Sequence, residues 1–485
     1  MSGKTLAQHV DDVSLPTTRR NGRGAMRHGP KQERTVGDKP KIRELLNESG
    51  CTHSPAKKTA CNTPTPGATS GGCAFEGAQI SLFPYADAAH LVHGPLTCLG
   101  ASWETRATRT SWRGRDLTQM GFTTAITNND VIFGGEEKLA RAIDYLVAQY
   151  APQAVFVYVT CVTALIGDDI DSVCKEAALR HSLPIIPVHA PGFVGSKNLG
   201  SRLGGEAVLK HLIGTLEPEE TTPFDINLIG EYNVTGDMWQ YTPLLEELGI
   251  RILATLSGDG RVAKIRTAHR ARLNVLVCAK SLVSLTRKME ERFGIPSVSV
   301  SFYGRRDTSN GLRAIVRALG NIDLMERTEA LIAREEAALE VRLVPYREIF
   351  RGKKAVLNTG GNKAWSITSA LQDLGFEVVA TAVGKSTEAD RDKAREYLGP
   401  NGVLMTKPAQ EQAKIIDDTG AHLLLAGGRS LYTALKKGIA FADVNQEKKK
   451  SYGGYQGLLN LAEDLKNALE TPVFRNVARR APWER

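Results

Sequence analysis

From about residue 150 onward, a short apolar run rich in β-forming residues is repeatedly followed by a stretch with helical spacing. This alternation, with nearly continuous apolar strands, predicts parallel sheets covered by helices on both faces. We therefore expect an α/β protein. The expected strands form two series, 154–160, 184–189, 225–231, 251–256, 273–278 and 297–302, then 354–358, 377–382, 403–405, 422–426 and 439–444.

A polar helical pattern at 322–344 contains no strand and separates the two series. It predicts a helical connector at 321–350 between Rossmann-like domains at 151–320 and a C-terminal Rossmann-like domain at 351–485. Shorter helical patterns lie between the strands, at 169–180, 238–248, 281–293, 364–374 and 391–398. Residues 46–150 are expected to form an N-terminal segment that binds a cluster, for the reason given below.

The positive charge of the chain is concentrated at its start. Residues 1–45 carry ten Lys or Arg and five Asp or Glu, so they supply more than half of the net charge of +9. Few large apolar residues accompany them, which predicts a disordered basic tail. A nucleic-acid-binding protein is the alternative, but no aromatic platform or binding motif supports it. We expect no nucleic-acid partner.

No apolar stretch approaches the roughly 18 residues that a membrane span needs, and the first residues lack the apolar segment of a signal peptide. We therefore expect a cytoplasmic protein without a membrane partner. Seven cysteines are spread over the 485 residues. In a reducing compartment they favour metal ligation or core packing over disulfides.

Four cysteines lie where the chain should leave a strand or make a tight glycine turn: Cys73, Cys98, Cys161 and Cys278. Thiolates are the ligands of iron-sulfur clusters, and a glycine or proline neighbour lets the backbone approach the inorganic sulfides. The first three are scattered over about ninety residues, too far apart for a local motif. Only tertiary structure could gather them, and three thiolates would leave one iron of a cubane for a partner chain.

Core packing is the alternative for each cysteine, because free cysteine is commonly buried. It suits Cys278, which ends an apolar strand, and it is favoured for Cys174, which falls inside an expected helix. A weak metal site could also be formed by a Cys-x-His-x7-Cys group in a polar stretch, Cys51, His53 and Cys61.

The glycine-rich segment 192–197 lacks the Gly-Lys-Ser/Thr of a phosphate loop, and the chain has no Gly-x-Gly-x-x-Gly fingerprint. ATP and NAD are therefore poorly supported. Backbone N–H groups of this segment, with Lys197 beside them, would suit an anionic cluster or a polycarboxylate. Further candidates lie at expected strand ends, where parallel sheets bind ligands: Gly360, Gly361, Gly427 and Arg429.

These segments resemble the nitrogenase component 1 family, whose α-type subunits carry Gly-Gly-Cys, His-Gly-Pro-x-x-Cys and strand-Thr-Cys in this order. The resemblance runs from about residue 40 to the end of the chain. It includes Ile166-Gly-Asp-Asp, Gly360-Gly, Gly427-Gly-Arg and Asp443-Val-Asn-Gln-Glu. Within the family, the chain looks like a subunit of the scaffold on which the iron-molybdenum cofactor is completed.

The resemblance implies that Cys73, Cys98 and Cys161 bind a [4Fe-4S] cluster at the interface with a NifN-like β subunit of an α2β2 heterotetramer. It places Cys278 where the catalytic relatives anchor their cofactor, so a transient precursor would be held there while molybdenum and homocitrate are added. The nitrogenase iron protein would assist, a NifB donor would supply the precursor, and apo-nitrogenase would accept the product.

Two departures from the catalytic relatives favour a scaffold over an enzyme. Their cofactor-binding histidine, in Tyr-His-Gly, is absent from Ser451-Tyr-Gly-Gly454. Their Gln-x-x-x-His loop reads Lys197-Asn-Leu-Gly-Ser201, so the resemblance implies that Lys197 and Ser201 lie in the precursor pocket. We expect no catalytic residue, and Gly453→His should add a second ligand if the pocket accepts the ring. The alternative is a nitrogenase-type or protochlorophyllide-reductase-like reductase component.

Overall fold

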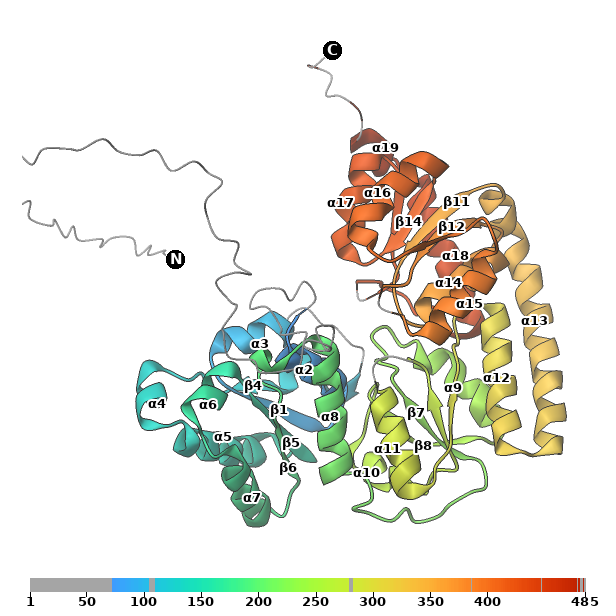
Figure 1. Cartoon of the computed structure of the whole chain (residues 1–485). Helices are drawn as coiled ribbons and strands as arrows, with labels where there is room; N and C mark the ends of the chain where they lie inside the picture. Colours follow the sequence, from blue (N-terminus) through green and yellow to red (C-terminus); the bar gives the residue numbers. More distant parts are fainter. Residues whose placement is uncertain are drawn as a thin grey trace, which may run out of the picture. The chain divides into compact units, whose positions relative to one another are not determined.

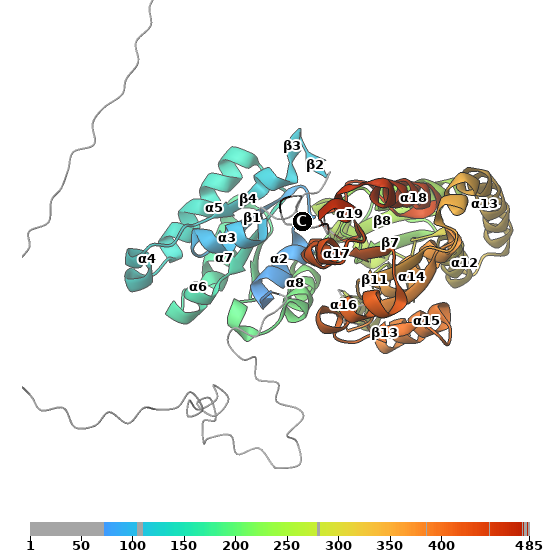
Figure 2. The same ribbon diagram turned by 90° about the horizontal axis from the view of Figure 1, so that it is seen from above.

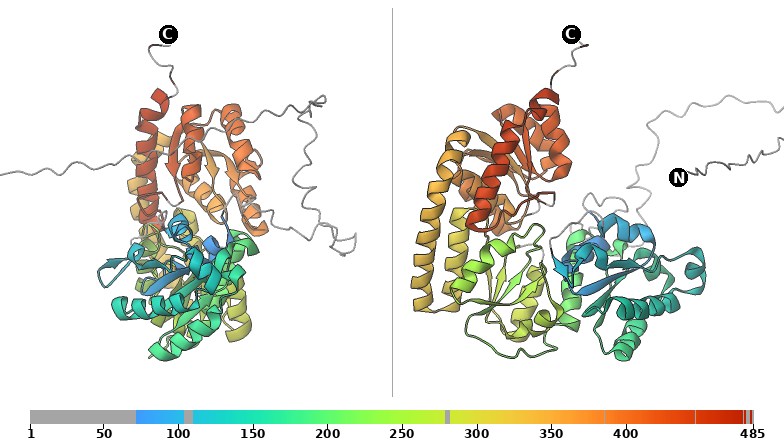
Figure 3. Two further views of the ribbon diagram at one scale, coloured as in Figure 1. Left: turned by 90° about the vertical axis from the view of Figure 1, so that its left-hand side faces the viewer. Right: turned by 180° about the vertical axis from the view of Figure 1, so that it is seen from behind.

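The structure is a computed structural model that describes residues 72–103, 110–278, 282–384, 386–445, 447–477, 479 and 483. These residues belong to a compact unit, Pro64–Arg485. The predicted basic tail and the Cys51, His53 and Cys61 group lie outside them. Each of the three larger sheets is entirely parallel, and helices cover both faces, as Figure 3 shows for the C-terminal sheet. The expected fold class is confirmed.

The first sheet has the strand order β4-β1-β5-β6. Every residue of its two central strands is buried, as a sheet covered on both faces requires. Its strands are β1 (Ala88–His93), β4 (Gly121–Thr123), β5 (Ala154–Val159) and β6 (Ile185–Val188). Its helices are α2 (Ala74–Leu82), α3 (Leu96–Trp103), α4 (Asn128–Phe133), α5 (Glu136–Tyr150), α6 (Cys161–Ile166), α7 (Ile170–His181) and α8 (Lys197–His211). A small antiparallel pair, β2 (Ser111–Trp112) and β3 (Arg115–Asp116), lies between β1 and β4 in the chain.

Strand β1 was not predicted, because His90 and His93 interrupt its apolar run. The structure buries both imidazoles completely. His90 Nδ1 lies 2.8 Å from the hydroxyl of Tyr158 on the neighbouring strand, and burial lowers the pKa of His90 to about 4. A neutral, hydrogen-bonded histidine therefore occupies a core position that sequence patterning assigns to polar surface.

The second sheet has the order β10-β9-β7-β8, and the third has the order β13-β12-β11-β14-β15. The second contains β7 (Asp225–Ile229), β8 (Arg251–Leu256), β9 (Leu273–Leu276) and β10 (Ser297–Ser299), with helices α9 (Met238–Glu247), α10 (Val262–Thr267), α11 (Val283–Phe293) and α12 (Arg305–Leu319). The third contains β11 (Lys354–Asn358), β12 (Glu377–Ala382), β13 (Val403–Met405), β14 (Leu423–Ala426) and β15 (Ala440–Asp443), with helices α14 (Lys363–Asp373), α15 (Glu388–Leu398), α16 (Pro408–Thr419), α17 (Leu431–Lys437), α18 (Gly454–Glu470) and α19 (Val473–Val477). All eleven predicted strands are present, with ends that differ by at most a few residues.

Helix α13 (Ile322–Phe350) joins the second and third sheets and lies beside α12 (Figure 1). It continues beyond the predicted helical pattern, through Pro345. A proline removes one backbone hydrogen bond from a helix, but Leu339, Leu343 and Phe350 are buried on the same face and hold the last turns in place. No helix in the described ranges is long and apolar enough to cross a membrane.

Candidate functional site

Cys73, Cys98 and Cys161 meet at the carboxyl-end edge of the first sheet. Cys98 lies in the first turn of α3, which follows β1, and Cys161 is the first residue of α6, which follows β5. Because β1 and β5 are parallel neighbours, their carboxyl ends bring these two cysteines to the same edge. Cys73 directly precedes α2 and forms an isolated bridge with Ser196. Two of the three thus lie in the first turn of a helix rather than in a loop, and the third directly precedes a helix.

The closeness of the sulfurs is visible at Gly192. A Cβ atom added to this glycine would lie 2.9 Å from Cys161 Sγ and 3.2 Å from Cys73 Sγ, so both sulfurs flank one point. Burial raises the pKa of the Cys98 thiol, and the charges of Cys161 and Cys73 raise it further. All three cysteines are partly exposed and none forms a disulfide.

A cluster fits this arrangement better than a single metal ion. In the part of the chain that the structure describes, no three His, Cys, Asp or Glu side chains surround one ion position. A cubane binds each thiolate at a different iron, so its sulfurs need not converge on one point. Three neighbouring thiolates at an exposed edge meet that requirement.

Hydrogen bonds fix the two strand ends from which Cys98 and Cys161 depart. The carbonyl oxygen of His93, the last residue of β1, accepts hydrogen bonds from the hydroxyls of Thr160, at 2.9 Å, and Thr163, at 3.1 Å. The His93 ring lies 2.9 Å from Asp168 through Nε2, and burial lowers its pKa. His93 is therefore a positioning residue and not a ligand.

Helices α2 and α8 lie side by side (Figures 1 and 2), and glycines let their backbones touch. A Cβ at Gly77 would be 1.9 Å from the carbonyl oxygen of Lys197, and Ser201 Oγ donates a 3.0 Å hydrogen bond to the Gly77 carbonyl. Lys197 Nζ pairs with Glu76 at 2.6 Å, close to Cys73. The contacts of Lys197 and Ser201 thus join them to the helix of Cys73, and their expected role in a precursor pocket stays a prediction.

Large apolar side chains are exposed on the helices around the three cysteines. Leu96 on α3 is 64% exposed, Phe133 on α4 is 85% exposed, and Leu165 on α6 is 76% exposed. Ile132 and Phe193 add to this surface. Helices α4 and α6, which carry three of these side chains, contact one another, and exposed apolar groups on neighbouring elements are a feature of surfaces that bind other proteins. We call these five residues the apolar rim.

Cys278 lies two residues beyond the end of β9. A Cβ at Gly230, the residue after β7, would be 3.1–3.3 Å from the backbone and Cβ of Cys278, so the two strand ends pack tightly. Asn362 donates a hydrogen bond to the carbonyl oxygen of Val277, which brings the turn after β11, with Gly360 and Gly361, to the same place.

Gly427 and Arg429 lie just beyond the end of β14, the strand next to β11. A Cβ at Gly427 would be 2.9 Å from Asn445 Nδ2, so this turn packs against the segment after β15. The structure therefore places these two residues at the same sheet edge as Gly360, and their expected role in cofactor binding stays a prediction.

Four charged residues near Cys278 were not foreseen: Glu231, Asp237, Lys363 and Lys448. Asp237 and Lys448 form an ion pair and are 3% and 1% exposed. Burial raises the pKa of Glu231, and the charge of Asp237 raises it further. Burial also acts to raise the pKa of Asp237, but Lys448, Lys363 and hydrogen bonds outweigh it and keep that pKa below its usual value. Glu231, Lys363 and Lys448 lie in the segments that follow β7, β11 and β15. This position after a strand end is the signal that could have identified them.

The Tyr452–Gly453 turn is held closely by Asp237, which accepts hydrogen bonds from the N–H groups of Tyr452, at 2.6 Å, and Gly453, at 3.1 Å. A Cβ at Gly453 would lie 2.6 Å from the Asp237 carbonyl oxygen. No side chain fits there without movement of backbone. The condition that the pocket accept a histidine ring at 453 is therefore not met in this structure.

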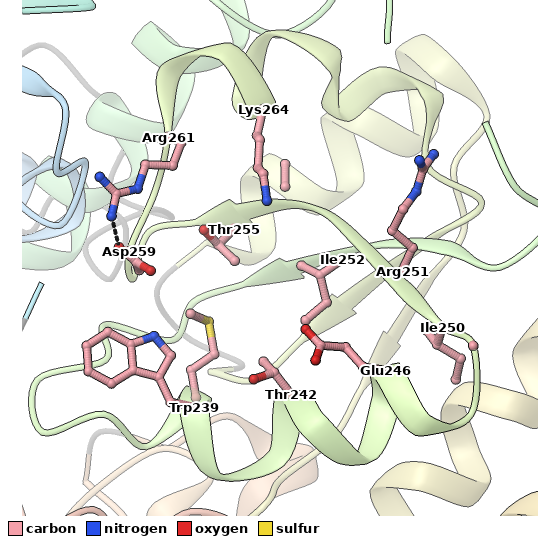
Figure 4. A pocket seen from close by; sticks show the side chains of 13 residues that line it. Trp239, Thr242, Glu246, Ile250, Arg251, Ile252, Thr255, Asp259, Arg261 and Lys264 are labelled. Carbon is pink, nitrogen blue, oxygen red and sulfur yellow. Dashed lines mark hydrogen bonds and ion pairs between the residues drawn. The ribbon is translucent and has the colours of Figure 1, made fainter. Parts of the chain in front are cut away.

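Cys174 is buried in the core, and burial raises the pKa of its thiol to about 12. The prediction that it packs is confirmed. A cavity of about 510 Å³ opens beside the edge strand β8, between α9 and α10 (Figure 4), and no predicted site residue lines it. Its Arg261 pairs with Asp259, and its Arg251 pairs with Asp225. Charged residues commonly protect such an edge from pairing with other strands, so we assign this cavity no ligand.

A family model described as nitrogenase component 1 type oxidoreductase matches residues 73–470. The nitrogenase iron-molybdenum cofactor biosynthesis protein NifE of Nostoc sp. (strain PCC 7120) is 54% identical over 92% of this chain and 94% of that protein. The protein of the same name from Klebsiella pneumoniae is 48% identical over 91% of this chain and 99% of that protein. Among solved structures, a chain of nitrogenase Cp1 at pH 6.5 has a TM-score of 0.77 and 25% identity, over 86% of this chain and 91% of that one.

Proposed function

Because the chain belongs to the nitrogenase component 1 type oxidoreductase family, we propose that it is the α-like subunit of a scaffold for iron-molybdenum cofactor biosynthesis. The observation that carries this proposal is that the chain has two separate cysteine sites, while the turn at Gly453 leaves no room for a side chain. One site gathers three thiolates at an exposed edge. The other offers the thiolate of Cys278, and the turn at Gly453 has no space for a side chain.

The three-cysteine site would hold a permanent [4Fe-4S] cluster through Cys73, Cys98 and Cys161. When bound, such a cluster supplies one-electron chemistry. Three thiolates leave the fourth iron to a NifN-like β subunit, and the apolar rim supports a protein partner at this edge. Two such pairs would form an α2β2 heterotetramer.

Cys278 would hold the cofactor precursor as cargo. A single thiolate suits temporary attachment, because a second protein ligand would slow release. On this basis the chain binds a precursor from a NifB donor, retains it while molybdenum and homocitrate are added with the nitrogenase iron protein, and passes it to apo-nitrogenase. The chain would act in the cytoplasm as a scaffold and not as a catalyst.

The test is to purify the complex without oxygen and to measure iron, molybdenum and activation of cofactor-free nitrogenase. Cys278→Ala should lose delivery and precursor iron but keep the permanent cluster. The triple change of Cys73, Cys98 and Cys161 to Ala should lose that cluster and weaken the complex. Cys174→Ala, at a buried cysteine outside both sites, is the matched control and should retain both.

Normal delivery by the Cys278→Ala complex would refute the anchoring role. Full iron and an unchanged cluster signal in the triple variant would refute the cluster assignment. Turnover of a reducible substrate by the purified complex, without apo-nitrogenase, would instead support the reductase alternative.

A further inference from the structure

The site at Cys278 contains two lysines whose charges are only partly balanced. Asn362 contacts the residue before Cys278, and Lys363 follows Asn362 at the start of α14. Lys363 Nζ lies 5.3 Å from the centre of the Tyr303 ring, and Lys448 Nζ lies 6.0 Å from the same point. Both ammonium groups are therefore gathered on one aromatic ring beside the Cys278 turn.

Lys363 has no carboxylate within ion-pair distance among the described residues. Its Nζ donates a 3.0 Å hydrogen bond to the carbonyl oxygen of Val444. Burial and the neighbouring Lys448 lower its pKa, so its surroundings disfavour the charged form. An ammonium group taken out of water is costly unless an anion accompanies it.

Lys448 is paired with Asp237, but this pair does not use all of its hydrogen-bonding capacity. A lysine ammonium has three donors, and Asp237 accepts only one of them. Asp237 also receives the N–H groups of Tyr452 and Gly453. The carboxylate therefore stays satisfied if Lys448 turns part of its charge toward a ligand.

The ion pairing of the two lysines favours an anionic guest. Lys448 is paired with Asp237, whereas Lys363 has no carboxylate partner within ion-pair distance in the described ranges and donates to a carbonyl oxygen instead. Lys363 follows Asn362, which holds the residue before Cys278. The lysine without a carboxylate partner thus lies next to the turn that carries the thiol.

We propose that Lys448 and Lys363 bind the negative charge of an anion held beside Cys278. The proposal rests on the proposed function and deepens it. It assigns to this lysine pair the charge complementarity that the sequence suggested for Lys197, whose ammonium pairs with Glu76 instead. The anionic chemistry is shared by an iron-sulfur precursor and by a polycarboxylate, and the experiment separates these two sources.

The experiment uses the purified complex and two readouts: precursor iron per complex, and binding of citrate as a tricarboxylate probe by titration calorimetry. Lys448→Met and Lys363→Met should each weaken retention of one or both anions about ten- to a hundredfold, the range for a lost charged hydrogen bond. Loss of citrate alone assigns the lysines to the carboxylate, and loss of iron alone assigns them to the precursor. Lys450→Met, two residues along at a partly exposed position, is the control and should change neither.

A structural role of Lys448 is separated by a double variant. Lys448→Met leaves the Asp237 charge buried and should lower the melting temperature. Asp237→Asn/Lys448→Met removes both charges, while the amide oxygen introduced at position 237 can still accept hydrogen bonds from the turn. The double variant should regain thermal stability without regaining the anion. Recovery of anion binding together with stability would overturn the proposal, as would full retention of both anions by both single variants.

Cys278→Ala distinguishes the failure of this inference from that of the proposed function. If Cys278→Ala retains all precursor iron, the proposed function fails at its anchoring step and the inference fails with it. If Cys278→Ala loses that iron while both lysine variants keep iron and citrate binding, only the lysine inference fails.

Discussion

Gly192→Ala tests the geometry of the three-cysteine site more sharply than removal of a ligand. The added methyl carbon would lie 2.9 Å from Cys161 Sγ and 3.2 Å from Cys73 Sγ. Favourable contacts between carbon atoms begin near 3.5 Å, and sulfur is larger, so each sulfur must move by about 0.5 Å or more. Ligands must be held within about 0.5 Å of their productive positions. A displacement of this size or more should therefore weaken binding of the cluster about ten- to a hundredfold.

The chain should still fold, because overpacking costs about 1–3 kcal/mol and the sulfurs are partly exposed. Iron content and the spectrum of the reduced cluster are measured in the complex, with thermal unfolding as the check on folding. Gly195→Ala is the matched control in the same segment. Its Cβ would lie 2.6 Å from Leu199 Cδ2, the end of a side chain that can turn aside. A Gly192→Ala complex with full iron and a wild-type spectrum would refute the proposed placement of the cluster.

Two further predictions concern Gly453 and Asp307. Gly453→His should destabilise the chain by about 1–3 kcal/mol or more and add no second ligand, because its Cβ would lie 2.6 Å from the Asp237 carbonyl oxygen. A variant that stayed stable in urea unfolding and also released precursor more slowly would contradict this prediction. Burial raises the pKa of Asp307 from 3.8 to about 6, so the folded chain keeps this proton at pH values where the unfolded chain has lost it. The free energy of unfolding should therefore fall by about 2–3 kcal/mol as the pH rises between these two pKa values. Asp307→Asn should remove this decline when the free energy of unfolding is measured from pH 4 to 7. Asp418→Asn, at an exposed position, is the control and should keep the decline. An unchanged decline in Asp307→Asn would count against a buried ionisable carboxyl at position 307.

The strands were predictable where apolar character was continuous, since burial on both faces of a parallel sheet leaves that pattern in the sequence. β8, β11, β12 and β13 begin and end at the predicted residues. β1 escaped prediction because its buried histidines are satisfied by distant partners, such as Tyr158 for His90. Helix α13 passed Pro345 because packing outweighed the local cost of a lost hydrogen bond.

The candidate ligands were predictable because cysteine chemistry and strand ends are visible in the sequence, whereas their surroundings were not. Lys197 has the charge that a precursor pocket needs, yet its nearest carboxylate is Glu76, on a helix that begins more than a hundred positions earlier. Lys448 stands in a run of lysines that looks like solvated surface, and the fold buries it against Asp237.

The sequence by itself determined the fold class, most of the strands, and which cysteines are candidate ligands. These follow from local chemistry: apolar runs indicate the sheets, and cysteines at strand ends indicate the candidate ligands. Only the tertiary structure decided that Cys73 and Cys161 meet at Gly192, that Gly453 has no room for a side chain, and that two lysines stand beside Cys278. The physical reason is that proximity, burial and charge pairing join residues far apart in the chain, and no local pattern encodes which distant groups will meet.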